Sequence, residues 1–251
     1  MADRSERRVA LVTGGGTGLG RAISLRFAEA GMDVAVNYSR SATEAAETVE
    51  AVSALGVRAE AYRADVARED QVGAMIEGVV RAFGRLDVLV ANAGATTFCA
   101  FDDLDGVSEA DWDTILGVNV KGAWFCARHA APHLRAHGAG HLVTISSTAG
   151  LITFGSSIPY CVSKAALIHL TRCLAKALAP EIQVNSVAPG YLDTRWGRRF
   201  GEEGARAFVA RSALKRVPSL DDVARQVLTL VTGTSSTGQV YVVDAGLTLT
   251  P

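Results

Sequence analysis

The sequence has few prolines, few cysteines and no long apolar run, and each shortage narrows the class of protein. Six prolines are spread over 251 residues without a linker-like cluster, so we expect a single domain over residues 1–251. The cysteines form no C-x-x-C pair and no metal-ligand spacing, which predicts reduced thiols, buried as small apolar residues, in a cytoplasmic protein. They are Cys99, Cys126, Cys161 and Cys173.

The sequence also has no large excess of charge of either sign. The formal net charge is -1, with neither a basic block nor an acidic tail, so nothing favours nucleic acid or an anionic membrane as a partner. Residues 1–8 are charged and lack the apolar core of a signal peptide, and no apolar run reaches the length of a membrane span. The sequence therefore predicts neither a nucleic-acid-binding protein nor a membrane protein.

One histidine pattern raises the question of a metal. His129, His133 and His137 recur every four residues and could line one helix face as zinc ligands. No acid or cysteine accompanies them and Pro132 interrupts the helix, so we favour a solvated face and predict no metal.

What the sequence does contain is a regular alternation of apolar strands and longer helical stretches. Such alternation is typical of a parallel sheet covered by helices on both faces. We therefore predict an α/β fold, a single-domain Rossmann fold with a doubly wound parallel sheet of about seven strands, and ligand-binding loops at the carboxyl ends of the strands. The expected strands are residues 9–13, 34–38, 58–62, 86–91, 142–145, 183–188 and 239–243, and the expected helices lie near 18–30, 41–55, 67–83, 108–136, 159–178 and 219–231.

The stretch 145–164, ISSTAGLITFGSSIPYCVSK, places Tyr160 and Lys164 four residues apart, on one face of a helix. Tyrosine is a poor proton donor at neutral pH because its ordinary pKa is about 10. A unit charge about 4 Å away supplies roughly 4 kcal/mol at an effective dielectric near 20, enough to lower that pKa to about 7. We expect Lys164 to make Tyr160 a usable acid or base. Y-x-x-x-K alone is common on ordinary helices. The catalytic interpretation therefore depends on the upstream serines and on a glycine loop near the N-terminus.

That glycine loop is TGGGTGLG, residues 13–20, between the first expected strand and helix. Gly14 permits the tight turn, Gly18 lets backbone N–H groups approach a pyrophosphate, and Gly20 lets helix and strand pack closely. No lysine follows the glycines, which excludes a triphosphate-binding P-loop.

The residues that end the second strand distinguish an NAD site from an NADP site. An NAD site needs a carboxylate there for the ribose 2′-hydroxyl, whereas a 2′-phosphate needs an arginine. The chain reads Tyr38-Ser39-Arg40 with no acid before Glu44, so we predict NADP(H) in preference to NAD(H). An ordinary surface arginine is the competing interpretation of Arg40.

Taken together, the motifs resemble the short-chain dehydrogenase/reductase family over nearly the whole chain, in particular 3-oxoacyl-ACP-reductase-like carbonyl reductases. The matching motifs are T-G-x-x-x-G-x-G at 13–20, Asp65-Val66, A-N-A-G at 91–94, Asn119, I-S-S at 145–147, Tyr160 with Lys164, and Pro189-Gly190 with Thr194. The resemblance implies a catalytic tetrad of Asn119, Ser147, Tyr160 and Lys164, with Ser146 as the alternative serine. The cofactor-binding residues are then Thr13, Gly14, Gly18, Leu19, Gly20, Tyr38, Ser39, Arg40, Asp65, Val66, Asn92, Ala93, Gly94, Tyr160, Lys164, Pro189, Gly190 and Thr194.

The activity implied is reversible, NADPH-dependent reduction of a ketone to a secondary alcohol, with Tyr160 as proton donor and Ser147 as hydrogen-bond donor to the carbonyl. An NAD-dependent sugar, polyol or steroid dehydrogenase would use the same tetrad and remains an alternative. A non-catalytic dinucleotide-binding sensor is a further one, although a sensor has no need of Tyr160 beside Ser147.

By the same resemblance, a substrate pocket is expected beneath a lid at residues 191–217. Its walls would be bulky and apolar, which suits a small-molecule carbonyl or alcohol substrate with a bulky apolar or aromatic body. The lid has four more positive than negative charges. These charges could bind an anionic substrate or could belong to an ordinary solvated surface helix, and we favour the surface helix. The expected wall residues are Thr96, Phe98, Ile152, Phe154, Tyr191, Leu192 and Trp196.

Partner surfaces are expected from two further segments. Acyl-carrier-protein reductases of this family dock their acidic partner with basic residues where this chain has residues 138–140 and 179–181, which read GAG and APE, arguing against a dedicated role in fatty-acid synthesis. The helix expected at 159–178 is apolar on almost every side, so part of it needs a partner. We predict a homotetramer, with a homodimer second.

Overall fold

The computed structural model describes residues 7–249 and has one parallel sheet of seven strands, in the order β3-β2-β1-β4-β5-β6-β7. The chain leaves β1 to one side for β2 and β3 and then to the other side for β4, which makes the β1/β4 boundary the topological switch point. The strands are β1 (Val9–Val12), β2 (Asp33–Tyr38), β3 (Ala59–Arg63), β4 (Val88–Ala91), β5 (Gly140–Ile145), β6 (Ile182–Pro189) and β7 (Val240–Val243).

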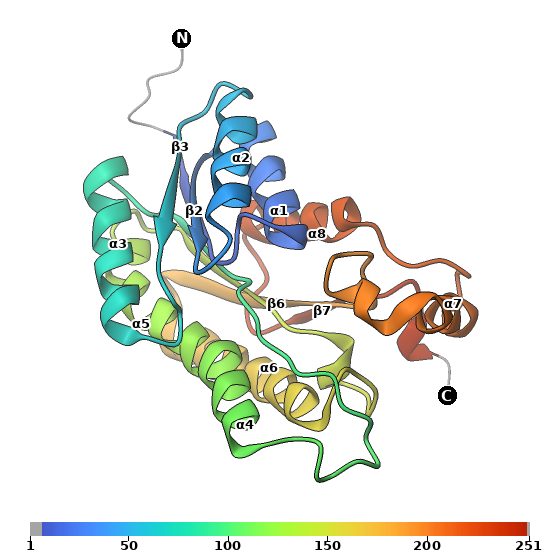
Figure 1. Ribbon diagram of the computed structural model, residues 1–251. Coiled ribbons are helices and arrows are strands. Elements are labelled where there is room, and N and C mark those ends of the chain that lie inside the picture. The colour runs from blue at the N-terminus through green and yellow to red at the C-terminus, as the bar shows by residue number, and fades with distance from the viewer. Residues whose placement is uncertain (1–6, 250–251) are drawn as a thin grey trace.

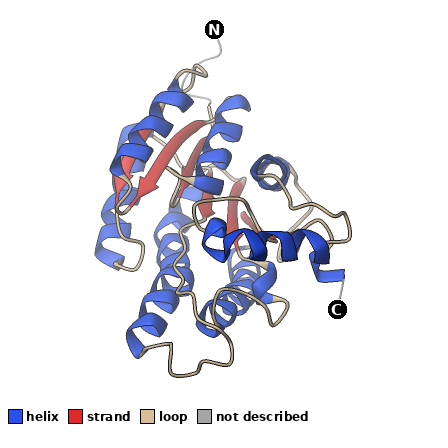
Figure 2. Ribbon diagram, turned by 45° about the vertical axis from the view of Figure 1, so that its right-hand side comes forward, coloured by secondary structure: helices blue, strands red, loops and turns tan. Residues whose placement is uncertain are grey.

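Helices cover both faces of this sheet (Figures 1 and 2). One layer consists of α1 (Gly18–Glu29), α2 (Ala42–Ser53) and α8 (Leu220–Thr232), which bury apolar side chains against the valine-rich face of the central strands. The other layer consists of α3 (Glu69–Phe83), α5 (Ala123–Arg135) and α6 (Ile158–Leu178), with α4 (Glu109–Leu116) continuing into α5. The doubly wound Rossmann fold predicted from the sequence is confirmed.

The long helix predicted at 108–136 is interrupted. Between α4 and α5 the chain widens into a π-helical segment (Gly117–Gly122) that contains Asn119. At its end a Cβ on Gly122 would lie 2.8 Å from Cγ2 of Val66, so only glycine lets the helix approach the loop after β3 this closely. Such π segments are frequent at functional sites because they re-aim side chains.

The segment predicted as a lid contains two helical pieces. A 3-10 turn (Gly197–Phe200) leads into α7 (Gly201–Arg211), a helix that the sequence-based assignment omits from its helices. Figure 1 shows α7 outside both helical layers, near the C-terminus. The remaining 3-10 turns are Thr148–Gly150 and Leu247–Leu249.

Candidate active site

All seven strands run parallel, so the loops that follow them meet at one edge of the sheet. The glycine loop follows β1, the A-N-A-G segment follows β4, the serine pair follows β5 and the lid follows β6. The structure therefore brings the predicted site segments together at the switch point and beside it.

The glycine loop has the shape that an anion-binding cradle requires. Gly14 and Gly18 have φ angles of +61° and +51°, which favour glycine. A Cβ on Gly20 would lie 2.1 Å from the carbonyl oxygen of Gly14, so no side chain fits there. The first turn of α1 contains no acid, and its N-cap residue Thr17 makes no side-chain cap, so these backbone N–H groups are open to an anion. The loop fits a dinucleotide pyrophosphate.

Three of the predicted cofactor residues hold the cradle together. The hydroxyl of Thr13 accepts hydrogen bonds from the backbone N–H groups of Asn92 (2.9 Å) and Ala93 (3.0 Å). The side-chain amide of Asn92 donates to the carbonyl oxygen of Thr13 at 2.8 Å. These polar groups are used within the protein, so they fix the distance between the loops after β1 and β4.

Asn37, which the sequence analysis did not single out, links the next two loops. Its amide oxygen accepts from the N–H of Gly14 at 3.2 Å, and its amide nitrogen donates to the carbonyl oxygens of Tyr62 (3.2 Å) and Ala64 (3.0 Å). Asn37 is 1% exposed. The sequence signal that could have found it is a polar amide near the end of an otherwise apolar strand. Beyond it Ser39 and Arg40 are exposed. No salt bridge between Arg40 and a carboxylate occurs within residues 7–249.

The loop after β3 is ordered by its own polar groups. The backbone N–H of Asp65 donates to the side-chain oxygen of Gln71 at 2.8 Å, and the carboxylate of Asp65 accepts from the N–H of Ala67 at 3.0 Å. Val66 points into the core and is 4% exposed. This loop thus offers a fixed polar edge at Asp65 and an apolar base at Val66.

Of the two adjacent serines, the structure places Ser147 next to Tyr160. The Ser147 hydroxyl hydrogen-bonds the phenol, which counteracts part of the effect of burial on the phenol's pKa. Ser146 is 3% exposed, and its hydroxyl donates to the carbonyl oxygen of Val187 at 3.1 Å and accepts from Ser186 at 2.7 Å. Ser146 is therefore fully engaged in joining β5 to β6.

Two hydroxyls fix Tyr160 at the start of α6. Ser157 caps the helix by accepting from the N–H of Tyr160, and Ser163 donates to the carbonyl oxygen of Tyr160 at 2.7 Å. Ser163 also accepts from the amide nitrogen of Asn119 at 2.9 Å, while Asn119 pairs with both backbone groups of Ala95 at 2.7 and 2.9 Å. Asn119 thus ties the π-helical segment to α6 and to the loop after β4.

Lys164 lies behind Tyr160, with its ammonium 5.6 Å from the centre of the phenol ring. The side chain is 3% exposed, and Nζ donates to the carbonyl oxygen of Ile145 at 2.9 Å. Burial lowers the pKa of Lys164 to about 8. The tetrad residues therefore lie close to one another, in the loop after β5, on α6 and in the π-helical segment.

The predicted fall in the pKa of Tyr160 is wrong for the protein alone. Burial raises the pKa of Tyr160 to about 12, and the hydrogen bond from Ser147 only partly opposes this. The estimate from the sequence placed a full charge about 4 Å away and omitted desolvation, which disfavours the phenolate. Tyr160 is consequently a neutral phenol at neutral pH, which is the form that can donate a proton.

The segment after β6 lies across the crevice. The amide N–H of Gly190 donates to the carbonyl oxygen of Val243 at 3.0 Å, which anchors its start. The methyl group of Thr194 lies 3.4 Å from the place where a Cβ on Gly18 would be. The indole of Trp196 lies 3.4 Å from the equivalent place on Gly94. Trp196 thus covers the space beside Gly94.

Aromatic rings from several segments gather beside Tyr160 and along the chain after β6. The ring centre of Trp196 is 6.0 Å from that of Tyr160. Tyr191 stacks on Phe208 of α7 at 4.6 Å, and Phe98 meets Phe200 edge to face at 5.0 Å. The predicted wall residues after β4 and after β6 are therefore brought together by α7 and the turn before it.

The cations of the lid segment are mostly engaged within the protein. Three pair with carboxylates and two lie over aromatic rings, as expected for a surface helix rather than for a receptor of anionic substrates. The ion pairs are Arg195 with Glu44, Arg198 with Asp193 and Arg206 with Glu202, and the ring contacts are Arg199 over Phe98 and Arg211 over Phe154.

The cysteines differ from the expectation drawn from the sequence. The expectation of four buried cysteines is wrong, because only Cys126 is buried and Cys173 is exposed on the outer face of α6. In residues 7–249 no three His, Cys, Asp or Glu side chains are grouped so that they could hold a metal ion. No helix in that range is both long enough and apolar enough to cross a membrane.

Comparison with known proteins gives a consistent result. The short chain dehydrogenase family model matches residues 8–205. A ketoacyl reductase of the granaticin polyketide synthase from Streptomyces violaceoruber is 41% identical, over 97% of both chains. The 3-oxoacyl-(acyl-carrier-protein) reductase FabG of Staphylococcus aureus is 37% identical, over 95% of this chain and 97% of its own.

Solved structures agree with the family match. A short chain dehydrogenase from Burkholderia cenocepacia, crystallised in complex with NADP, has a TM-score of 0.91 and 37% identity, and covers 98% of this chain and 100% of its own. An NADPH-dependent 3-quinuclidinone reductase from Rhodotorula rubra has a TM-score of 0.87 and 29% identity, with 97% and 92% covered. The chain belongs to the short-chain dehydrogenase/reductase family and is an NAD(P)-dependent oxidoreductase.

Proposed function

We propose that the protein catalyses the reversible, NADPH-dependent reduction of a ketone to a secondary alcohol. The observation that carries the proposal is the contact of Ser147 with a neutral, half-buried Tyr160 in front of Lys164. The bound nicotinamide supplies the hydride that reduces the carbonyl carbon.

The roles proposed for the side chains follow from their surroundings. Ser147 donates a hydrogen bond to the substrate carbonyl, which stabilises the negative charge that develops on its oxygen. Tyr160 delivers the proton to that oxygen, because its raised pKa keeps the proton on the phenol until it is needed. Lys164, buried and charged, stabilises the phenolate that remains and holds the cofactor ribose. Asn119 fixes the backbone of the π-helical segment behind them.

For the cofactor we propose NADP(H) in preference to NAD(H). The end of β2 offers the neutral amide of Asn37 and the exposed Ser39 and Arg40, with no carboxylate to repel a phosphate. The related short chain dehydrogenase from Burkholderia cenocepacia, whose crystal structure holds NADP, supports this preference. An NAD-dependent sugar, polyol or steroid dehydrogenase would show the opposite ratio of turnover with the two cofactors.

For the substrate we propose a ketone with a bulky apolar or aromatic body. The rings of Phe98, Tyr191, Trp196 and Phe208 support this assignment, since flat apolar walls bind apolar substrates best. Residues 191–217 act as the lid over it. The name of the Streptomyces relative, a ketoacyl reductase of polyketide synthesis, agrees with a substrate of this kind.

We further propose that the protein is a homotetramer in the cytoplasm. Trp124 on α5 and Val162 on α6 are 44% and 45% exposed, and Val242 on the edge strand β7 is 41% exposed. Two apolar surfaces, one on the α5 and α6 layer and one at the β7 edge, would allow two different two-fold contacts. Sedimentation analysis distinguishes the tetramer from a dimer or a monomer.

The activity is tested by following NADPH absorbance over a panel of aromatic ketones, oxoacyl thioesters and keto sugars. The proposal requires NADPH consumption with at least one carbonyl, and the fastest turnover with the bulky apolar ones. Absence of turnover with every carbonyl, despite NADPH binding, would favour the non-catalytic sensor.

A further inference from the structure

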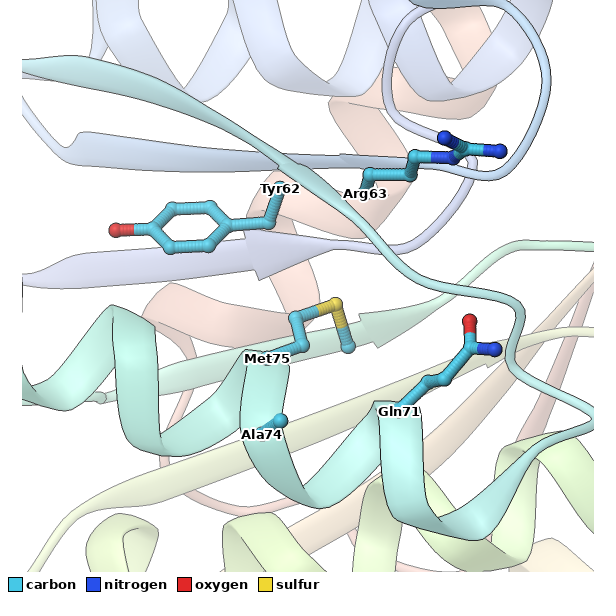
Figure 3. A pocket seen from close by; sticks show the side chains of 5 residues that line it. All are labelled: Tyr62, Arg63, Gln71, Ala74 and Met75. Atoms are coloured by element: carbon cyan, nitrogen blue, oxygen red, sulfur yellow. The ribbon is translucent and has the colours of Figure 1, made fainter.

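Arg63, the last residue of β3, lies beside the end of β2. In the register of the two strands its Cα is paired with that of Tyr38, the residue just before Ser39 and Arg40. Side chains of paired residues in neighbouring strands point to the same face of a sheet. Figure 3 shows the Arg63 side chain extending away from Met75 and α3. Arg63 at the end of β3 and Arg40, in the turn just after β2, therefore follow strand ends that are paired with each other.

These cations have no anionic partner in the described chain. Within residues 7–249 neither Arg40 nor Arg63 forms a salt bridge. The nearest acid after β2, Glu44, binds Arg195 at 3.0 Å. A doubly charged anion that both guanidinium groups reach would accept charge-assisted hydrogen bonds from each of them.

The surroundings leave Arg63 accessible to a ligand. Arg63 is exposed, which leaves its guanidinium open to a ligand. Its stem also borders a cavity of about 400 Å³ between β3 and α3, which lies on the other face of the sheet from Tyr38 and is not part of this site. The cavity's lining is Tyr62, Arg63, Gln71, Ala74 and Met75 (Figure 3). The same turn holds Asp65, whose backbone Gln71 fixes, so the loop beside Arg63 is already ordered.

We infer that Arg63 is a specificity-determining residue that binds the 2′-phosphate of NADP(H) together with Ser39 and Arg40. The inference rests on the proposed preference for NADP(H) and adds a ligand from a second strand. A phosphate monoester accepts hydrogen bonds from two guanidinium groups at once, which neither arginine alone provides. The pairing of Tyr38 with Arg63 is the feature that assigns this role.

The test uses binding rather than turnover. Adenosine 2′,5′-bisphosphate and adenosine 5′-monophosphate are titrated calorimetrically into the wild type, Arg63→Gln and Arg40→Gln, and NADPH and NADH are titrated by their fluorescence. Arg81→Gln, on the exposed face of α3, is the matched control. Arg63→Gln should weaken the bisphosphate and NADPH by about ten- to a hundredfold, the loss of a hydrogen bond to a charged group, and leave the monophosphate and NADH unchanged.

Each result decides between separate claims. A wild type that prefers NADPH, together with Arg63→Gln that keeps the whole preference, overturns the role of Arg63 alone. Equal weakening of bisphosphate and monophosphate by Arg63→Gln also overturns it, because the effect is then not on the phosphate. A wild type that binds NADH better than NADPH refutes the proposed cofactor preference itself.

Discussion

Replacing Lys164 by methionine should make the protein more stable at neutral pH while abolishing its activity. Burial lowers the pKa of Lys164 from 10.5 to about 8. Each unit by which the pKa is lowered corresponds to about 1.36 kcal/mol, so keeping Lys164 charged inside the folded chain costs roughly 3 kcal/mol. Methionine has a similar length and no charge, but the carbonyl oxygen of Ile145 loses its hydrogen bond, worth about 1 kcal/mol. The free energy of unfolding at pH 7 should thus rise by about 2 kcal/mol.

The pH dependence gives this prediction its specific signature. The folded chain releases the Lys164 proton near pH 8 and the unfolded chain near 10.5, so between these values the unfolded state binds more protons. The stability of the wild type from this group therefore rises with pH over that interval. The advantage of Lys164→Met should be complete below pH 8 and decrease above it. By about pH 10.5 the variant should be the less stable protein by about 1 kcal/mol, because only the loss of the Ile145 hydrogen bond remains.

The assay is urea unfolding of both proteins at equal concentrations, from pH 7 to 10.5. Lys176→Met, an exposed lysine on the same helix, serves as the control and should give no gain. A variant Lys164→Met that is less stable than the wild type at pH 7, or whose gain does not change with pH, would refute the electrostatic reasoning.

Two further predictions concern the serine pair and the lid. Ser147→Ala should lower kcat by about a hundredfold or more. Ser146→Ala should keep kcat and lose about 1–2 kcal/mol of stability, because the Ser146 hydroxyl bonds only to buried groups of β6. Equal losses of kcat in the two variants would show that the wrong serine was assigned. Trp196 covers the space beside Gly94, so binding of NADP⁺ should displace it and change the tryptophan emission. Trp196→Phe should remove that change and Trp124→Phe should keep it, and a signal that survives in Trp196→Phe would contradict the displacement.

The elements of the fold could be predicted because each rests on a local pattern. Apolar runs predicted all seven strands, with ends within two residues of those observed: β3 is displaced by one residue, β4 starts two residues later and β5 two residues earlier. The π-helical segment around Asn119 could not be predicted, because it follows from how closely Gly122 approaches Val66 in space.

The site was predictable where a motif sets the spacing and not where environment or strand pairing decides. Ser147, Tyr160 and Lys164 meet as their spacing indicated, yet the direction of the pKa change at Tyr160 was missed because desolvation is a property of the folded chain. Arg63 was missed for a related reason: only the register of β3 against β2 places it near Arg40.

The most direct test of the account is Tyr160→Phe, assayed with NADPH and the best ketone of the panel. The phenyl ring keeps the packing against Trp196 and removes only the proton donor. We predict that kcat falls by about a thousandfold or more while the affinity for NADPH is unchanged. Turnover close to that of the wild type would contradict the proposal that Tyr160 delivers the proton.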